Sequence, residues 1–282
     1  MSSEMLSKLT IEEESIVHPG ERVDDLECNG FRIIQNPSFF CFGIDAILLS
    51  DFAYSGDRDK YCGEKWDQEE KDKEPKIYKK QVCDFCTGTG ILPMLLLAKG
   101  KAGNVTGLEI QEPVAEMAGR SVKLNHVEDR CQIFGGEKGD IRKIRFNFRP
   151  EIFHAVTCNP PYIQDAGGLT NPSDTLNISR HEVEMELEDV IAGAQYLLKQ
   201  GGSLTMVHKP FRLSDIISLM KKYHLEPKRM RMVQPSEGKE PNMVLIEAVK
   251  GGKSYLKVLP SLNVYDKDGN YTKEVLKIYG ML

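Results

Sequence analysis

A chain of 282 residues is long enough to bury a full hydrophobic core, which predicts one large domain or one domain with a small appendage. With 40% hydrophobic and 28% charged residues it resembles ordinary soluble proteins, and no run approaches the roughly 18 apolar residues of a membrane span. The polar, acidic start excludes a signal peptide, seven cysteines without a regular framework predict a reducing cytoplasm, and the net charge of −5 argues weakly against a nucleic-acid partner.

The first predicted elements form a small extension ahead of the main fold. Residues 26–51 begin as a β-hairpin that turns at Asn29-Gly30 and continue into a helix from Gly43 to Phe52. Residues 55–76 are a mixed-charge segment, for which we expect a loop or linker. The predicted divisions of the chain are 1–54 for the hairpin and helix, 55–80 for the charged linker, 81–250 for the main domain and 251–282 for a C-terminal extension.

Strand and helix patterns then alternate from Gln81 to about Lys209, which predicts an α/β fold with helices on both faces of a mostly parallel sheet. The expected strands are 82–86, 105–110, 131–134, 153–158, 203–208, 228–233 and 243–249, and the expected helices are 91–98, 112–125, 187–198 and 213–223. Gly201-Gly202 is expected to end the helix 187–198. The last two strands would close the sheet as a hairpin-like pair, giving seven strands with one antiparallel member.

A glycine-rich turn follows the first of these strands, with the sequence Asp84-Phe85-Cys86-Thr87-Gly88-Thr89-Gly90. Gly88 and Gly90 let the backbone pass close to a ligand at the carboxyl end of a strand, which is typical of a nucleotide-like cofactor. Cys83 and Cys86 form a C-x-x-C pair, but they lie in the strand and its exit, and no second pair completes a metal site. We therefore expect ordinary thiols and no metal.

Two acidic residues that follow the next strands are candidates for binding the ribose and the adenine of such a cofactor. Glu109 ends the second strand nineteen residues after Gly90, the distance expected of a carboxylate that accepts both hydroxyls of a ribose. Asp140 follows the third strand and is placed to accept a hydrogen bond from the adenine N6 of the cofactor. Ile110 and Ile141 would flank the adenine ring. The alternative for the two acids is an exposed position at a helix start.

The sequence Asn159-Pro160-Pro161-Tyr162 follows an apolar strand and narrows the chemistry to methylation of an amino or amide nitrogen. An asparagine oxygen and a backbone carbonyl can accept hydrogen bonds from a poorly nucleophilic NH2 group and favour a transition state in which its nitrogen becomes tetrahedral and positive. The prolines stiffen the turn, and the Tyr162 ring offers a flipped base a stacking surface. The alternative is an ordinary polar turn.

Basic residues gather between residues 196 and 232, where only Asp215 and Glu226 oppose them. Such a cluster suits the phosphates of a nucleic acid, and a solvated helix face is the equally weighted alternative. The residues assigned to substrate RNA on the first interpretation are Tyr162, Lys209, Arg212, Lys228, Arg229 and Arg231.

Five segments together resemble the bacterial tRNA1(Val) (adenine-37-N6)-methyltransferase family, and the similarity extends from Leu26 to Gly280. The segments are 36–52 with Phe42-Gly43-Ile44-Asp45-Ala46, 84–93, 159–162, Ser179-Arg180-His181-Glu182 and 242–247. The resemblance implies a Rossmann-like class I methyltransferase fold, S-adenosyl-L-methionine as methyl donor, and N6 methylation of the adenine beside the anticodon of a tRNA.

The resemblance also implies roles for single residues. Asp84 would contact the methionine amino group of the cofactor directly or through water, and Phe42 and Gly43 would pack over its methionine end. Cys86 replaces the usual glycine, which we expect to alter the packing of the turn rather than the chemistry. The full expected cofactor set is Phe42, Gly43, Asp84, Cys86, Thr87, Gly88, Gly90, Glu109, Ile110, Asp140, Ile141 and Asn159.

Two alternatives remain for the function. The first is methylation of a glutamine side-chain amide in a protein such as a release factor, which uses the same chemistry. The region before Gln81 has too little helical pattern for the helical substrate domain expected there. The second is a non-enzymatic module that binds S-adenosylmethionine or RNA, against which the intact Asn159 argues. The exact tRNA and the oligomeric state are left open.

Overall fold

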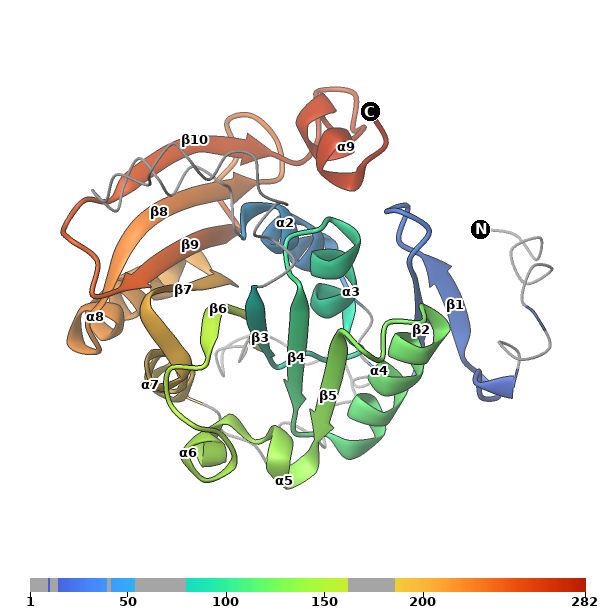
Figure 1. Cartoon of the computed structure of the whole chain (residues 1–282). Coiled ribbons are helices and arrows are strands. Elements are labelled where there is room, and N and C mark those ends of the chain that lie inside the picture. Colours follow the sequence, from blue (N-terminus) through green and yellow to red (C-terminus); the bar gives the residue numbers. More distant parts are fainter. Residues whose placement is uncertain (1–9, 11–14, 40–41, 54–79, 162–185) are drawn as a thin grey trace, which may run out of the picture.

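The computed structural model describes residues 10, 15–39, 42–53, 80–161 and 186–282. They form one large sheet with helices on both faces and a separate two-stranded hairpin (Figure 1). Three parts of the sequence interpretation lie outside the described residues: the charged segment 55–76, Tyr162, and the run from Ser179 to Glu182. Among the described residues, no helix is both long and apolar enough to cross a membrane.

The large sheet has eight strands in the order β10-β8-β9-β7-β6-β3-β4-β5. Their bounds are β3 Gln81–Phe85, β4 Asn104–Glu109, β5 Cys131–Gly135, β6 Phe153–Cys158, β7 Leu198–His208, β8 Leu225–Gln234, β9 Met243–Lys250 and β10 Lys257–Asn263. Strand β9 is antiparallel to both β7 and β8, and the other neighbouring strands of this sheet run parallel. The predicted fold class is confirmed.

The eighth strand, β10, was not expected. It comes from the C-terminal extension and pairs with the outer edge of β8. Most of its residues are exposed and it contains Pro260, so it lacks the apolar alternation that marks a half-buried strand. Its place in the fold depends on the free edge that β8 offers.

Two hydrophobic cores lie on the two faces of the sheet. Helices α2 (Ile44–Phe52), α3 (Ile91–Ala98) and α9 (Lys273–Tyr279) contribute to the first core, together with Val122 of α4 (Glu112–Leu124). Helices α7 (Leu187–Leu197) and α8 (Leu213–Lys222) cover the second. Because successive side chains of a strand point to opposite faces, β3 supplies Val82 to the first core and Cys83 to the second.

The predicted N-terminal hairpin is confirmed at its turn, but its first strand lies before Leu26, where the predicted hairpin begins. Strands β1 (Arg22–Asp25) and β2 (Arg32–Gln35) pair antiparallel, and both Asn29 and Gly30 in the connection have positive φ. The hairpin rests on α4: the Ile34 N–H donates to Ser121 Oγ over 3.0 Å. The hairpin thus covers a side of α4 that the large sheet does not cover.

The prediction that Gly201-Gly202 ends a helix is wrong. Helix α7 ends at Leu197, and β7 begins at the next residue and contains both glycines. Gly201 has φ +76°, and a Cβ on Gly202 would lie 2.8 Å from the Lys199 carbonyl oxygen. The two glycines therefore allow the irregular backbone of β7 at the point where its register with β6 shifts.

Four short helical segments also went unpredicted, because three or four residues show no helical period. They are α5 Gly136–Gly139, η5 Ile141–Lys143, α6 Ile144–Asn147 and η7 Pro210–Arg212.

Candidate functional site

The candidate site lies at the carboxyl edge of four neighbouring parallel strands, β6, β3, β4 and β5. The glycine turn follows β3, Glu109 ends β4, and Asp140 follows β5 by way of α5. Asn159 comes directly after β6. The sheet topology therefore brings together four chain segments that the sequence places up to seventy-five residues apart. This is the edge at which ligands bind in open α/β sheets.

Asp84 ties the glycine turn to β6. Its carboxyl group is fully buried, and it accepts hydrogen bonds from the hydroxyls of Thr87 (2.7 Å) and Thr157 (2.5 Å). Burial raises the pKa of Asp84 to about 7, with a smaller contribution from the charge of Glu109, and the two hydroxyls oppose the rise. The predicted contact of Asp84 with the cofactor stays a prediction.

The raised pKa predicts that Asp84 makes stability depend on pH. The native carboxyl keeps its proton up to about pH 7, whereas the unfolded one loses it near the ordinary value of 3.8. Unfolding therefore becomes easier as pH rises between these values, by roughly 1 kcal/mol per pH unit, and this component levels off above pH 7. Asp84→Asn, which cannot ionise, should gain stability relative to wild type across this range.

Urea unfolding of both proteins at pH 5, 6, 7 and 8 measures this difference. Asp268→Asn, which removes an exposed carboxylate from the C-terminal extension, provides the matched control. A difference between wild type and Asp84→Asn that is the same at every pH would contradict the assignment.

Cys86 adopts a backbone conformation that favours glycine. Its φ is +55°, in the left-handed region, and its thiol hydrogen-bonds with that of Cys158. No disulfide joins either of them to another cysteine among the described residues, and the same holds for the buried Cys83. The resemblance expects a glycine at this position, and the φ of Cys86 is one that glycine adopts without strain.

Replacing Cys86 should separate backbone strain from chemistry. A left-handed non-glycine residue costs about 1–2 kcal/mol, whereas glycine adds about 0.4–1 kcal/mol of entropy loss on folding. Cys86→Gly is therefore expected to be at least as stable as wild type. Cys86→Val, whose branched side chain suits this region least, should be less stable. The midpoints of thermal unfolding test the order, and a Gly variant that melts below the Val variant would refute it.

Glu109 holds the other side of the glycine turn. It is 5% exposed, and its two oxygens accept hydrogen bonds from the backbone N–H of Gly88 and of Gln111, each over 3.0 Å. Burial raises the pKa of Glu109, and the backbone donors counteract part of that rise. The carboxylate is therefore fixed at the turn, and its contact with a cofactor ribose stays a prediction.

Asp140 forms an ion pair with Arg142, two residues further along the chain. Its oxygens accept from Nε and a terminal nitrogen of Arg142, both over 2.9 Å, and from the Arg142 backbone N–H. Burial acts to raise the pKa of Asp140, but the hydrogen bonds and charge of Arg142 outweigh it and hold the pKa below its usual value. The predicted contact of Asp140 with the adenine of a cofactor stays a prediction. Next to it, Ile141 is buried, and Ile110 at the end of β4 is half-buried.

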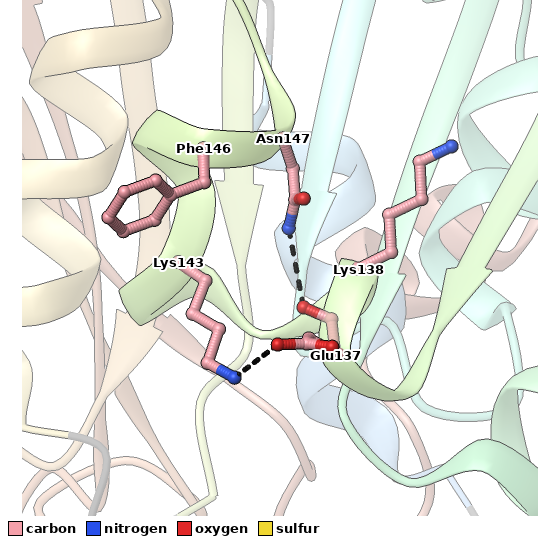
Figure 2. A pocket seen from close by; sticks show the side chains of 5 residues that line it. All are labelled: Glu137, Lys138, Lys143, Phe146 and Asn147. Atoms are coloured by element: carbon pink, nitrogen blue, oxygen red, sulfur yellow. Dashed lines mark hydrogen bonds and ion pairs between the residues drawn. The ribbon is translucent and has the colours of Figure 1, made fainter.

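A surface pocket lies between α5 and α6. It is lined by Glu137, Lys138, Lys143, Phe146 and Asn147. Figure 2 shows Lys143 paired with Glu137 (2.7 Å) and the Asn147 side chain directed at the Glu137 carbonyl oxygen. Phe146 is 90% exposed. None of the predicted site residues lines this pocket.

Asn159 contacts a residue that sequence reasoning did not select. Its side-chain Nδ2 donates to Oδ2 of Asp45, near the start of α2, over 2.9 Å. The available signal was the position of Asp45 inside the run Phe42-Gly43-Ile44-Asp45-Ala46, from which only Phe42 and Gly43 were chosen. Of the following prolines, Pro160 is buried and Pro161 is exposed.

The prediction of a basic patch for RNA is wrong for two of its members, and a third is half-buried in an ion pair. Lys228 and Arg229 are buried: Lys228 donates to the Lys253 carbonyl oxygen. Arg229 pairs with Glu247 over 2.6 Å and lies over the Phe52 ring. The third member, Arg231, makes a two-pronged ion pair with Glu274. These three side chains hold β8, β9, α2 and α9 together.

The other two members lie at the edge of the sheet that carries the candidate site. Lys209 and Arg212 directly follow β7, at the same edge of the sheet as Asn159, and both are half-buried. Arg212 pairs with Asp215 over 2.9 Å. Phe211 between them is 63% exposed.

A protein-family model described as the methyltransferase small domain matches residues 72–224, more than half of the chain. The chain belongs to this family. The matched part of this methyltransferase small domain contains the glycine turn, Glu109, Asp140 and Asn159. It leaves out the hairpin, α2 with Asp45, and strands β8 to β10.

Several relatives carry the name tRNA1(Val) (adenine(37)-N6)-methyltransferase. One from Porphyromonas gingivalis is 30% identical over 164 residues, covering 58% of this chain and 63% of the relative. One from Bacteroides thetaiotaomicron is 28% identical over 167 residues, covering 59% and 67%. The match thus spans about two thirds of the length of these relatives.

Solved structures share the fold. A predicted O-methyltransferase from Agrobacterium tumefaciens has a TM-score of 0.59 at 20% identity, over 84% of this chain and 96% of the other. P. horikoshii TYW2 in complex with MeSAdo has a TM-score of 0.53 at 13% identity, over 83% and 73%. At these identities the likeness supports the Rossmann-like methyltransferase fold and nothing finer.

Proposed function

We propose that this methyltransferase small domain protein transfers a methyl group from S-adenosyl-L-methionine to N6 of an adenine in tRNA, namely adenine 37 of tRNA1(Val). The observation that carries the proposal is Asn159, which follows β6 beside the glycine turn and donates its side-chain NH2 to Asp45. Membership of the family and the names of the relatives support the reaction and the substrate.

The residues at the carboxyl edge fit the donor. A Cβ added at Gly88 would meet nothing within 4 Å, so space is open over the turn, and the Glu109 carboxylate is fixed beside it. Glu109 would hold the ribose, Asp140 and Ile141 the adenine, and the turn itself the methionine part with Asp84. S-adenosylmethionine supplies an activated methyl group when it is bound.

The task left to the protein is to make a weak nucleophile react. The lone pair of an adenine amine is delocalised into the ring, so acceptors aimed at its N–H groups favour the tetrahedral, positive nitrogen of the transition state. Asn159 supplies a side-chain oxygen, and Pro160 a carbonyl without a competing N–H of its own. Tyr162 would stack on the flipped base.

One labelling experiment distinguishes the candidates. The protein is incubated with methyl-labelled donor and with tRNA1(Val), the same tRNA carrying guanine at position 37, or a release factor. Label in the first RNA alone supports the proposal. Label in the release factor supports glutamine methylation, and donor binding without transfer to any of the three supports a binding module. Either of the last two results refutes the proposal.

The two basic residues after β7 provide a separate prediction. Reversing Lys209 and Arg212 to Glu should weaken tRNA binding and reduce the salt dependence of log K by about 0.7–0.9 for each phosphate that the variant no longer neutralises. Donor affinity should not change. The matched control is reversal of Lys221 and Lys222 at the other end of α8, which should leave tRNA binding intact. Salt-series binding curves with equal slopes for both variants would contradict a role for Lys209 and Arg212.

A further inference from the structure

The Asn159 side chain has a charged partner from a distant part of the chain. Asp45 lies 114 residues upstream, in the first turn of α2, and is 8% exposed. Its Oδ2 accepts from Asn159 Nδ2 over 2.9 Å, and its Oδ1 accepts from the Ala46 N–H over 2.9 Å. The segment that matches the family model begins at residue 72, so α2 contributes to the site from outside it.

We propose that Asp45 is the positioning residue of this site: it fixes the Asn159 amide so that the amide oxygen, and not the NH2 group, faces the substrate nitrogen. The inference rests on the proposed function. An ionised carboxylate only accepts hydrogen bonds, so the amide must turn its NH2 group toward Asp45. The reverse orientation would place an oxygen against the carboxylate and a donor against the substrate amine, which is also a donor.

The charge of Asp45 adds to this effect. A hydrogen bond to a charged acceptor is stronger than a neutral one and polarises the amide that donates it. The Asn159 oxygen therefore becomes a better acceptor for the substrate N–H groups. A buried negative charge behind the amide also favours the positive charge that develops on the nitrogen.

The surrounding structure holds Asp45 in place. A Cβ on Gly43 would lie 2.9 Å from Asp45 Oδ1, so glycine leaves the room that the carboxylate occupies. Helix α2 is buried along most of its length. Lys99 joins it to α9, since its Nζ donates to Ser50 Oγ and to the Ile278 carbonyl oxygen. Helices α2 and α9 thereby support Asp45 in the candidate site.

Steady-state kinetics with tRNA and donor test the role. Asp45→Ala should lower kcat by up to about 10²-fold, the loss that a misplaced group can cause, with an unchanged KM for the donor. Asp45→Asn keeps an acceptor but no longer excludes the reversed amide, so its kcat should lie between Asp45→Ala and wild type. Asp51→Asn, which removes an exposed carboxylate from the same helix, is the control and should match wild type.

A double-mutant cycle distinguishes positioning from general damage. If Asp45 acts through Asn159, adding Asp45→Ala to Asn159→Ala should lower kcat little further. Losses that multiply in the double variant would overturn the proposal, as would wild-type kcat in Asp45→Ala. Thermal unfolding of each variant shows whether the fold is retained.

A second readout does not depend on activity. The side-chain NH2 signals of Asn159, identified in an NMR spectrum by their loss in Asn159→Ala, should shift in Asp45→Ala and less in Asp45→Asn. Unshifted signals would refute the contact. If the wild-type protein fails to methylate tRNA but these signals shift, the proposed function falls while the pairing of Asp45 with Asn159 stands.

Discussion

Asn159→Ala is expected to lower the rate of methyl transfer by about 10²–10³-fold, the usual loss for one polar group that stabilises a transition state. The alanine removes the acceptor for the substrate amine and leaves the carboxylate of Asp45 without this donor. Donor binding should stay near wild type, because the glycine turn is held by Asp84 and Glu109.

Single-turnover rates with bound tRNA and calorimetry with donor measure the two quantities separately. Asn270→Ala, an exposed asparagine in the C-terminal extension, serves as the control. A variant that keeps more than about a third of the wild-type rate, where 10²-fold is expected, would remove Asn159 from the mechanism.

Glu109→Ala should act on the donor instead. It removes the two acceptors expected for the ribose hydroxyls, worth on the order of 1.5–3 kcal/mol each before compensation. It also removes the acceptors of the Gly88 and Gln111 N–H groups, so the turn loses the bonds that shape it. We expect donor affinity to fall on the order of 10²-fold or more.

A more conservative substitution at the same residue gives a second test. In Glu109→Gln, one oxygen becomes an NH2 group, which must face one of two backbone donors. Glutamine should therefore also weaken donor binding, although it has nearly the shape of glutamate. Glu128→Gln, at an exposed position after α4, is the control. Calorimetry that shows wild-type affinity in Glu109→Ala would exclude its role at the ribose.

Local signals in the sequence predicted much of the fold. The strand 153–158 and the helix 91–98 have the predicted bounds, because an apolar strand and a helix opened by glycine are marked by their own residues. Strand β10 and the short helices α5 and α6 were not predicted, because their residues show no hydrophobic periodicity of their own and depend on the neighbouring elements.

By itself, then, the sequence determined which residues end the parallel strands, and a parallel sheet brings those ends to one edge whatever the rest of the chain does. The glycine turn, Glu109 and Asn159 meet there for that reason. Only the tertiary structure decided the partners of Asp45 and Arg229. The pairing of Asp45 with Asn159, and the burial of Arg229 against Glu247, depend on elements packed across long separations. The role of a charged residue depends on its distance to a partner, its burial and the direction of its side chain. The sequence alone does not show these quantities.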